Sequence, residues 1–276
     1  MKTVALPDGT RVPALGQGTW MMAEDARRRA GEIAALQAGI DCGLTLIDTA
    51  EMYADGASET LVGEAIAGVR EGLFLVGKAY PQNASRGRLR AACEASLKRL
   101  GTDRFDLYLL HWRGAVPLAE TVEAMERLKE TGLIARWGVS NLDTDDMVEL
   151  IEAGGEGCAT DQILYNLTRR GPEHDLLPWL AARGMATMAY SPVEQGRLAR
   201  NAALGEIARD LDATPAQVAL AWTLLRDDVI SIPKAGTVAH VAENRAALDL
   251  VLDRETIGRL DQAFPRPAGP VPLGMY

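Results

Sequence analysis

Four side chains in the first half of the chain are of the types that protonate a carbonyl oxygen during its reduction. They are, in order, Asp48, Tyr53, Lys78 and His111. A tyrosine hydroxyl, with an ordinary pKa of about 10, donates its proton poorly at neutral pH unless a nearby cation lowers that pKa. Lys78 can supply the cation while Asp48 keeps it charged and oriented. His111 can hydrogen-bond the carbonyl oxygen beside Tyr53, so we expect a carbonyl-reducing site whose hydride comes from elsewhere.

Polar residues follow successive apolar segments that have the length and composition of β-strands. The predicted strands are residues 15–18, 44–47, 73–76, 105–110, 134–139, 160–164, 185–189 and 229–232. The polar residues at or near their ends include Asp48, Lys78, His111, Ser140, Asn141, Gln162, Tyr190 and Ser191. In a parallel barrel the carboxyl ends of all strands meet at one face, so we expect these side chains to converge there.

Helical patterns separate the predicted strands. In residues 85–100, Leu89, Cys93, Ser96 and Leu100 recur at the spacing of one face of an amphipathic helix. Further helices are predicted over residues 24–42, 118–129, 144–153, 173–183, 214–225, 238–248 and 253–264. Strands that alternate with helices indicate an α/β fold with a parallel sheet, and eight such units favour a closed (β/α)8 TIM barrel. An open, doubly wound sheet is the alternative.

The two ends of the chain add to this barrel. Asp8 and Gly9 lie between two short apolar runs, which predicts an N-terminal β-hairpin that caps the fold. Thr214 followed by Pro215 is typical of a helix start, and predicts an extra helix before the last strand. Residues 253–264 add a C-terminal helix, after which the irregular tail 265–276 can fold over one mouth of the barrel. Without an internal linker, residues 1–276 are expected to form a single domain.

The amino-acid composition indicates which kind of protein this is and which binding partners it disfavours. The chain is 47% hydrophobic and 24% charged, which is typical of a folded globular protein. Its 29 basic and 38 acidic residues give a net charge of -9, which disfavours binding to nucleic acids and anionic membranes. No apolar stretch is long enough to span a bilayer, and the N-terminus lacks the pattern of a secretory signal. We therefore expect a cytoplasmic, monomeric protein whose partner is a small molecule.

Metal binding is not predicted. The histidines are His111, His174 and His240, and none has another ligand at the spacing of a metal site. The three cysteines form no CxxC motif and are interpreted as small core residues.

The order and spacing of the four candidate catalytic residues resemble the catalytic tetrad of the aldo-keto reductases. Further motifs of that family occur in the same order across nearly the whole chain: Leu15-Gly-Gln-Gly-Thr-Trp20, Gly138-Val-Ser-Asn141, Gln162, Ala189-Tyr-Ser-Pro192, Ser231-Ile-Pro-Lys234 and Glu243-Asn244. The resemblance implies an oxidoreductase that reduces aldehydes and ketones to alcohols, with hydride from the nicotinamide of NADPH and a proton from Tyr53.

The resemblance also implies how a cofactor is held. Ser140, Asn141 and Gln162 would bind the nicotinamide carboxamide, and Tyr190 would stack on the ring. Gly18, Thr19 and Trp20 would border the nicotinamide and the substrate, and Ser191 would contact the pyrophosphate. The adenosine end would lie along residues 232–244, where the helix start near Thr237 offers backbone N–H groups to phosphate. The residues expected at this end are Lys234, Thr237, His240, Glu243 and Asn244.

One part of this pattern departs from the family. Where the family usually has Lys-Ser and later an arginine, this chain has Lys234-Ala235 and His240. Lys234 keeps a full charge, whereas a histidine side chain is largely uncharged at neutral pH and cannot form the bidentate fork of arginine. NADPH remains the expected cofactor, and NADH is expected to be accepted as well.

The loops at the predicted barrel mouth are short after the fourth and seventh strands, at residues 112–117 and 193–201. An open pocket, lined by Trp20, Met52, Trp112 and the C-terminal tail, favours small aldehydes and dicarbonyls such as methylglyoxal over steroids.

Two other functions are compatible with parts of the pattern. A class I aldolase uses a lysine on a barrel strand to form a Schiff base, and Lys78 ends such a strand. That interpretation leaves Ser140, Asn141, Gln162 and Tyr190 without a role. The resemblance also includes regulatory subunits that sense a cofactor, but this chain has no long N-terminal extension or basic tail that would indicate a partner.

Overall fold

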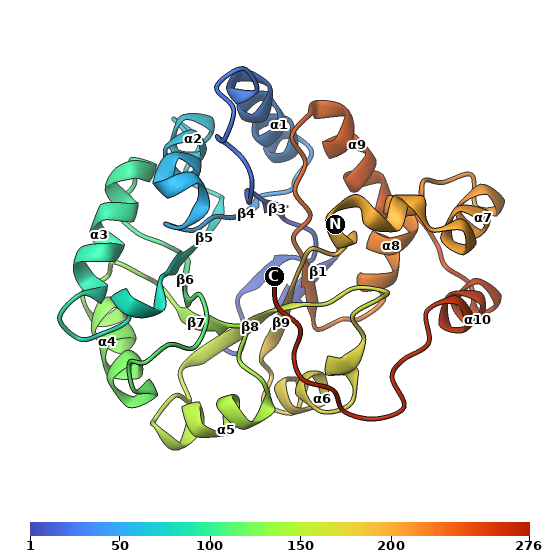
Figure 1. The fold of residues 1–276 in the computed structure, drawn as a ribbon. Helices are drawn as coiled ribbons and strands as arrows, with labels where there is room; N and C mark the ends of the chain where they lie inside the picture. Colours follow the sequence, from blue (N-terminus) through green and yellow to red (C-terminus); the bar gives the residue numbers. More distant parts are fainter.

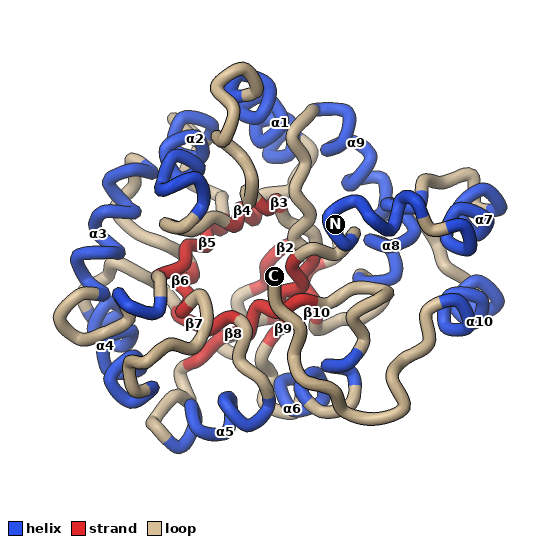
Figure 2. Tube along the Cα trace, viewed as in Figure 1, coloured by secondary structure: helices blue, strands red, loops and turns tan.

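Eight parallel strands form a closed barrel in the computed structural model, which describes residues 1–276 (Figure 2). They are β3 (Gln17–Gly18), β4 (Leu46–Asp48), β5 (Phe74–Ala79), β6 (Leu107–Leu110), β7 (Trp137–Ser140), β8 (Cys158–Leu164), β9 (Ala186–Tyr190) and β10 (Val229–Ser231). Each strand pairs with the next one along the chain. The backbone N–H groups of Gly16 and Gly18 donate to the carbonyl oxygens of Ser231 and Pro233 at 2.8 and 3.0 Å, which joins the first strand to the last. The predicted (β/α)8 barrel is confirmed.

Helices surround the strands on the outside (Figure 1). They are α1 (Arg29–Asp41), α2 (Ala57–Ala65), α3 (Leu89–Leu100), α4 (Leu118–Glu130), α5 (Thr144–Glu152), α6 (Leu176–Ala181), α7 (Ala202–Asp210), α8 (Pro215–Thr223), α9 (Val238–Ala246) and α10 (Arg254–Ala263). In Figure 1, α7 and α10 lie outside the ring and pack against each other. None of these helices combines the length and the apolar character needed to cross a membrane.

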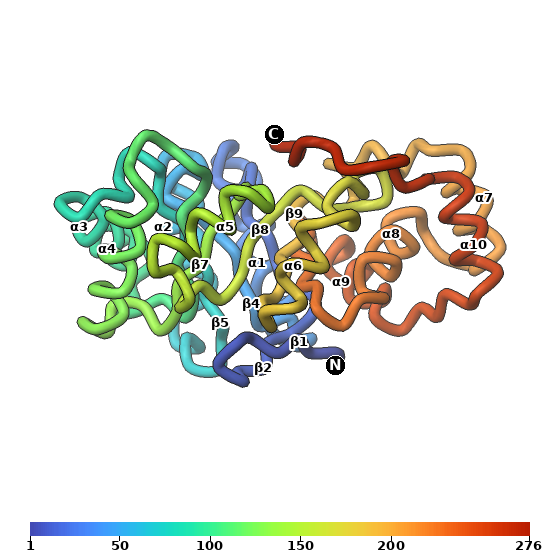
Figure 3. The backbone as a smooth tube through the Cα atoms, turned by 90° about the horizontal axis from the view of Figure 1, so that it is seen from below, coloured from blue at the N-terminus to red at the C-terminus, as the bar shows by residue number.

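The N-terminal hairpin closes one end of the barrel. Its strands, β1 (Thr3–Ala5) and β2 (Arg11–Pro13), pair antiparallel as predicted. Val4, Leu6 and Val12 are buried in the same apolar cluster as the inward-facing residues of the barrel strands. Figure 3 shows the hairpin at the end of the barrel opposite to the C-terminus. The other end therefore remains available for a functional site.

The alternation of side chains along each strand directs the polar residues inward. On β4, Leu46 belongs to the cluster inside the barrel and Ile47 to the one between strands and helices, so Asp48 faces inward again. On β5, Val76 faces inward and Lys78 follows it by two residues. The lower part of the barrel interior is thus filled by aliphatic side chains, and its upper part by the polar candidates.

Several element boundaries differ from those predicted. α1 begins only at Arg29, because Asp25 accepts hydrogen bonds from Arg27 in a separate turn. The sequence patterns do not predict α2 and α7, which are short helices that pack against neighbouring helices. The prediction that the helix after Thr214 is additional to the barrel is wrong. This helix, α8, packs on β10 and α9 as part of the ring, and α7 is the additional helix outside it. The predicted cap of α8 is present: the Thr214 hydroxyl accepts from the Gln217 backbone N–H at 3.2 Å.

The contact between α2 and α3 gives a test of this packing. A Cβ atom at Gly63 would lie 2.7 Å from the Leu100 carbonyl oxygen, whereas one at Gly31, in α1, would meet nothing within 4 Å. We expect Gly63→Ala to lower the free energy of unfolding by about 1–3 kcal/mol because the helices must separate. Gly31→Ala should raise it by up to about 1 kcal/mol because alanine favours the helix. Denaturant unfolding of both variants measures this, and equal effects would contradict the close approach.

Candidate functional site

A cavity of about 800 Å³ opens at the carboxyl ends of the barrel strands. Its wall includes residues from most of the strand ends, from the segment before α1, from the start of α9 and from the last two residues of the chain. This volume lies in the range of small-molecule and cofactor sites. The predicted residues that line it are Gly18, Trp20, Asp48, Met52, Tyr53, His111, Trp112, Ser140, Asn141, Gln162, Tyr190, Ser191, Lys234, His240, Glu243 and Asn244.

A buried ion pair lies at the bottom of the cavity. The Lys78 ammonium donates to Asp48 Oδ2 at 2.7 Å, and both side chains are almost entirely excluded from solvent. The ammonium also donates to the Thr49 carbonyl oxygen at 3.1 Å and to the Tyr53 hydroxyl oxygen at 2.9 Å. Gln162 donates to the other Asp48 oxygen at 2.8 Å. Because Lys78 already donates to the hydroxyl oxygen of Tyr53, the tyrosine keeps its own proton free for another acceptor.

The effect of this arrangement on Tyr53 differs from the sequence prediction. The structure does not support the expected lowering of the pKa by Lys78: burial raises the pKa of the hydroxyl well above its ordinary value, and the Asp48 carboxylate raises it further. The charge of Lys78 is balanced by Asp48, so little net positive charge acts on the tyrosine. Tyr53 therefore remains protonated in the resting site and holds a proton that it can donate.

His111 follows β6 and lies edge-on to the Tyr53 ring, with ring centroids 5.8 Å apart. Burial, reinforced by the positive charge of Lys78, lowers the pKa of the imidazole to about 2. Its Nδ1 atom is buried without a hydrogen-bond partner. The ring is therefore neutral, and can take part in one further hydrogen bond beside Tyr53.

Amide and hydroxyl groups lie on the cavity wall next to the ion pair. Asn141 donates to the His111 carbonyl oxygen at 3.1 Å and to Ser140 Oγ at 3.0 Å, and accepts from the Tyr190 hydroxyl at 2.8 Å. Ser140 donates in turn to the Gln162 carbonyl oxygen at 2.7 Å. Asn141 has the left-handed backbone conformation, at φ 61°, that asparagine tolerates better than most residues. These side chains are thus fixed by one another around the cavity.

The far end of the cavity is formed by the end of the last strand and the start of α9. Lys234, His240, Glu243 and Asn244 line this part. Thr237 caps α9, and its hydroxyl accepts from the His240 backbone N–H at 3.2 Å. A cation beside a helix N-terminus suits an anionic group such as a phosphate.

Three predicted site residues do not reach the cavity wall. Lys78 is fully buried behind Asp48 and Tyr53. Thr19 is buried as well, and its hydroxyl donates to the Asp48 carbonyl oxygen at 3.0 Å. Thr237 acts as the cap of α9. Direct contact of Thr19 and Thr237 with a cofactor therefore stays a prediction, as do the roles of the residues that line the cavity.

The C-terminal tail folds over the open end of the barrel, as predicted (Figure 3). The Tyr276 hydroxyl donates to Glu194 Oε1, and Arg197 donates to the Tyr276 oxygen at 2.9 Å. Glu194 also accepts from Asn166 and Arg169, at 2.6 and 2.9 Å. The loop after β9 and the tail are thus joined across one side of the cavity.

Sequence reasoning missed several residues of the cavity wall because none of them stands directly at the end of a strand. They are Met21, Glu24, Asp25, Arg28 and Glu32 near the start of α1, and Gln195, Gly196, Ala199 and Ala216 after β9. Most of the first group lies in the segment that the sequence pattern predicts as the start of a long helix. A turn signal is present there, since Asp25 is followed by arginines that can bond its carboxylate.

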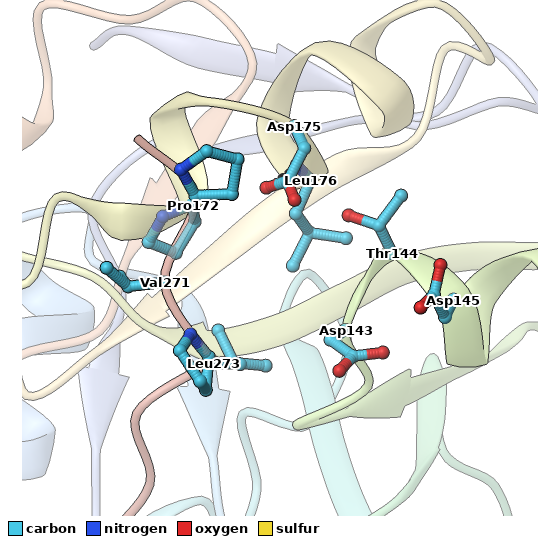
Figure 4. A pocket seen from close by; sticks show the side chains of 10 residues that line it. Asp143, Thr144, Asp145, Pro172, Asp175, Leu176, Val271 and Leu273 are labelled. Carbon is cyan, nitrogen blue, oxygen red and sulfur yellow. Dashed lines mark hydrogen bonds between the residues drawn. The ribbon is translucent and has the colours of Figure 1, made fainter. Parts of the chain in front are cut away.

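A second, smaller cavity of about 240 Å³ lies between the starts of α5 and α6 and the tail (Figure 4). Asp143, Asp145 and Asp175 border it, and Asp143 and Asp175 cap the two helices. None of the candidate catalytic or cofactor residues reaches this cavity. The structure groups no three His, Cys, Asp or Glu side chains that could hold a metal ion.

Comparison with known proteins supports the same chemistry. Residues 14–264 match the sequence profile of the aldo/keto reductase family. The chain belongs to the aldo/keto reductase family. It is 53% identical over 280 residues to methylglyoxal reductase YeaE of Escherichia coli (strain K12), a match that covers 99% of each protein.

Solved aldo/keto reductases have the same fold. An aldo/keto reductase from Klebsiella pneumoniae in complex with NADP and acetate has a TM-score of 0.97 and 51% identity, over 100% of this chain and 99% of that one. A structure of an aldo-keto reductase from the same organism in complex with NADPH gives the same values. The predicted family resemblance and fold are confirmed.

The polar side chains that line the cavity of this aldo/keto reductase fit a nicotinamide adenine dinucleotide phosphate. Amide and hydroxyl groups of Ser140, Asn141 and Gln162 at one end match a carboxamide, and the lysine at the other end matches a phosphate. The cavity connects the two ends, and Tyr53 and His111 line it as well.

The state of His111 can be measured directly. Because its pKa is lowered to about 2, we expect the imidazole to stay neutral from about pH 4 to 9, with side-chain NMR resonances that do not titrate. In the unfolded chain this histidine takes up a proton near pH 6.5, whereas the folded His111 stays neutral there. The free energy of unfolding therefore falls progressively as the pH decreases below that value. A His111 titration near pH 6.5 would contradict the burial.

Proposed function

We propose that this aldo/keto reductase reduces small aldehydes and dicarbonyls, of which methylglyoxal is the first candidate, to alcohols with NADPH. The observation that carries the proposal is the hydrogen bond from Lys78 to the Tyr53 oxygen at 2.9 Å, with the charge of the ammonium balanced by Asp48. This bond directs the tyrosine proton towards the cavity. A carbonyl oxygen placed there would find a proton donor and a neutral imidazole side by side.

The residues can carry out the proton half of the reaction. A carbonyl oxygen between Tyr53 and His111 can accept hydrogen bonds from both. NADPH supplies the hydride to the carbonyl carbon when it is bound. As negative charge develops on the substrate oxygen, Tyr53 transfers its proton and Lys78 stabilises the resulting phenolate by its hydrogen bond. Asp48 keeps Lys78 in place, so the donor geometry is set before the substrate arrives.

The same geometry indicates which residues hold the cofactor. We propose that Ser140, Asn141 and Gln162 bind its carboxamide, with Tyr190 beside the ring and Ser191 at the pyrophosphate. At the adenosine end, Lys234, His240, Glu243 and Asn244 would complete the site, with Gly18 on the opposite wall.

The proposal of a small substrate rests on the aromatic wall and the tail. Trp20, Met52 and Trp112 line the cavity near the tetrad, and Trp112 packs edge-on against Tyr80 with ring centroids 5.9 Å apart. Met275 and Tyr276 border the same cavity, and the polar contacts of Tyr276 hold the tail over it. The short loops predict an open pocket, whereas the tail closes part of it, and the bounded space that remains suits a short carbonyl compound. The 53% identity to a protein named methylglyoxal reductase supports methylglyoxal as the first to test.

The burial of Lys78 disfavours the aldolase alternative. A Schiff base needs the lysine amine to attack a carbonyl carbon, but this amine is fully buried and donates to three oxygens. A cofactor-sensing subunit would keep the same four residues, and is distinguished because it would bind NADPH without turning over any aldehyde.

We further propose that residues 1–276 act as one domain and as a monomer in the cytoplasm, without nucleic-acid or membrane partners. The two apolar clusters share the barrel strands, which supports a single domain. The net charge of -9 supports the absence of anionic macromolecular partners. Three unpaired cysteines suit a reducing compartment.

Tyr53→Phe tests the proposed proton donor. The variant keeps the ring but removes the proton, so we expect kcat for methylglyoxal reduction to fall by at least roughly 100-fold. NADPH affinity, measured by fluorescence titration, should change little because the hydroxyl faces the substrate. Tyr80→Phe is the matched control, since Tyr80 packs on Trp112 outside the tetrad and should retain activity. Wild-type turnover by Tyr53→Phe would rule out the mechanism.

A further inference from the structure

The adenosine end of the cavity has few positive charges for a cofactor that carries an extra phosphate. Lys234 is one full charge, and His240 stands where the family pattern has an arginine. The carboxylates of Glu32 and Glu243 border the same cavity. A further cation at this end would favour the binding of a 2′-phosphate.

Arg28 is in the right part of the molecule to supply that cation. It is the residue before α1 and lines the same cavity as Lys234 and His240. α1 and α9 pack side by side on neighbouring positions of the ring (Figure 1). Both helices begin at the face that carries the cavity, because each follows a strand whose carboxyl end lies there. Arg28 and the first turn of α9 therefore border one rim.

The guanidinium of Arg28 is also uncommitted. Its closest carboxylate is Asp25, at 3.9 Å from Nε. That carboxylate already accepts two hydrogen bonds from Arg27, at 3.0 and 2.9 Å. The side chain of Arg28 is 72% exposed, so its planar fork can turn towards an anion at the cavity rim. By contrast, Arg29 pairs with Glu64 at 2.6 Å and does not reach the cavity.

We propose that Arg28 binds the 2′-phosphate of NADPH together with Lys234, and so sets the preference for NADPH over NADH. The inference rests on the proposed function for the identity of the cofactor. In this account the arginine missing from α9 is replaced by one from the start of the neighbouring helix. The start of α9, which Thr237 caps, then adds the positive end of the helix dipole.

The test uses adenosine 2′,5′-bisphosphate and ADP, which differ in where their second phosphate lies and contain no nicotinamide. Isothermal titration calorimetry of the full-length protein should show that Arg28→Ala weakens the binding of the 2′,5′-bisphosphate roughly tenfold. The affinity for ADP should stay unchanged. Likewise, Arg28→Ala should weaken the binding of NADPH and leave the binding of NADH unchanged. The loss of affinity for NADPH should become smaller as salt is added. Arg28→Lys should lose less affinity for the 2′,5′-bisphosphate than Arg28→Ala, because lysine keeps the positive charge although it lacks the bidentate guanidinium.

Arg29→Ala is the control, because it removes an equal charge one position away while sparing the pair of Arg27 with Asp25. It should bind both nucleotides like the wild type. Equal affinity of Arg28→Ala and wild type for the 2′,5′-bisphosphate would overturn the proposal, as would an equal loss for both nucleotides. Failure of the proposed function is distinguishable, since it would appear as no methylglyoxal turnover by the wild type with either cofactor.

Discussion

The ion pair between Asp48 and Lys78 is the interaction on which the site depends. Both groups are buried at the mouth of a barrel whose lower interior is aliphatic, so each needs the other to remain charged. Removing one partner of such a pair typically costs about 3–5 kcal/mol, because the remaining charge is left without compensation. Here the pair also has a directional consequence: three oxygens accept from the one ammonium, and one of them belongs to Tyr53.

The fold supplies this arrangement through two regularities. Alternation along the strands turns Asp48 and Lys78 inward, and parallel pairing brings the ends of β4 and β5 side by side. The loop after β4 then returns Tyr53 to the pair, and the two residues directly after the tyrosine, Ala54 and Asp55, have left-handed backbone with φ of 47° and 57°. Non-glycine residues seldom adopt this conformation, so the surrounding contacts must maintain it. The tyrosine is thus held by its backbone as well as by its hydrogen bond.

Most of the fold and the core of the site can be predicted from the sequence, because strand periodicity and strand-end polar residues are local signals. Asp48, His111 and Gln162 are placed at the barrel mouth by these signals alone. The features that the sequence patterns do not predict depend on packing between segments that are far apart in the sequence. α2 contains Gly63, a poor helix residue, which is there because α3 approaches closely.

Two features of the site depend on such packing. Arg28 carries no local signal of its own, since only the packing of α1 on α9 brings it to the cavity. The pKa of Tyr53 does not follow from the presence of a lysine, because it depends on burial and on how Asp48 balances the charge of that lysine.

A kinetic double-mutant cycle tests the central claim most directly. Asp48→Asn and Lys78→Met, alone and together, would be compared for kcat of methylglyoxal reduction under saturating NADPH. If the two residues act on Tyr53 as one unit, each single variant loses most of the activity, and the double variant is about as active as the poorer single one. Losses that multiply in the double variant would show that Asp48 and Lys78 act independently, and would contradict the account.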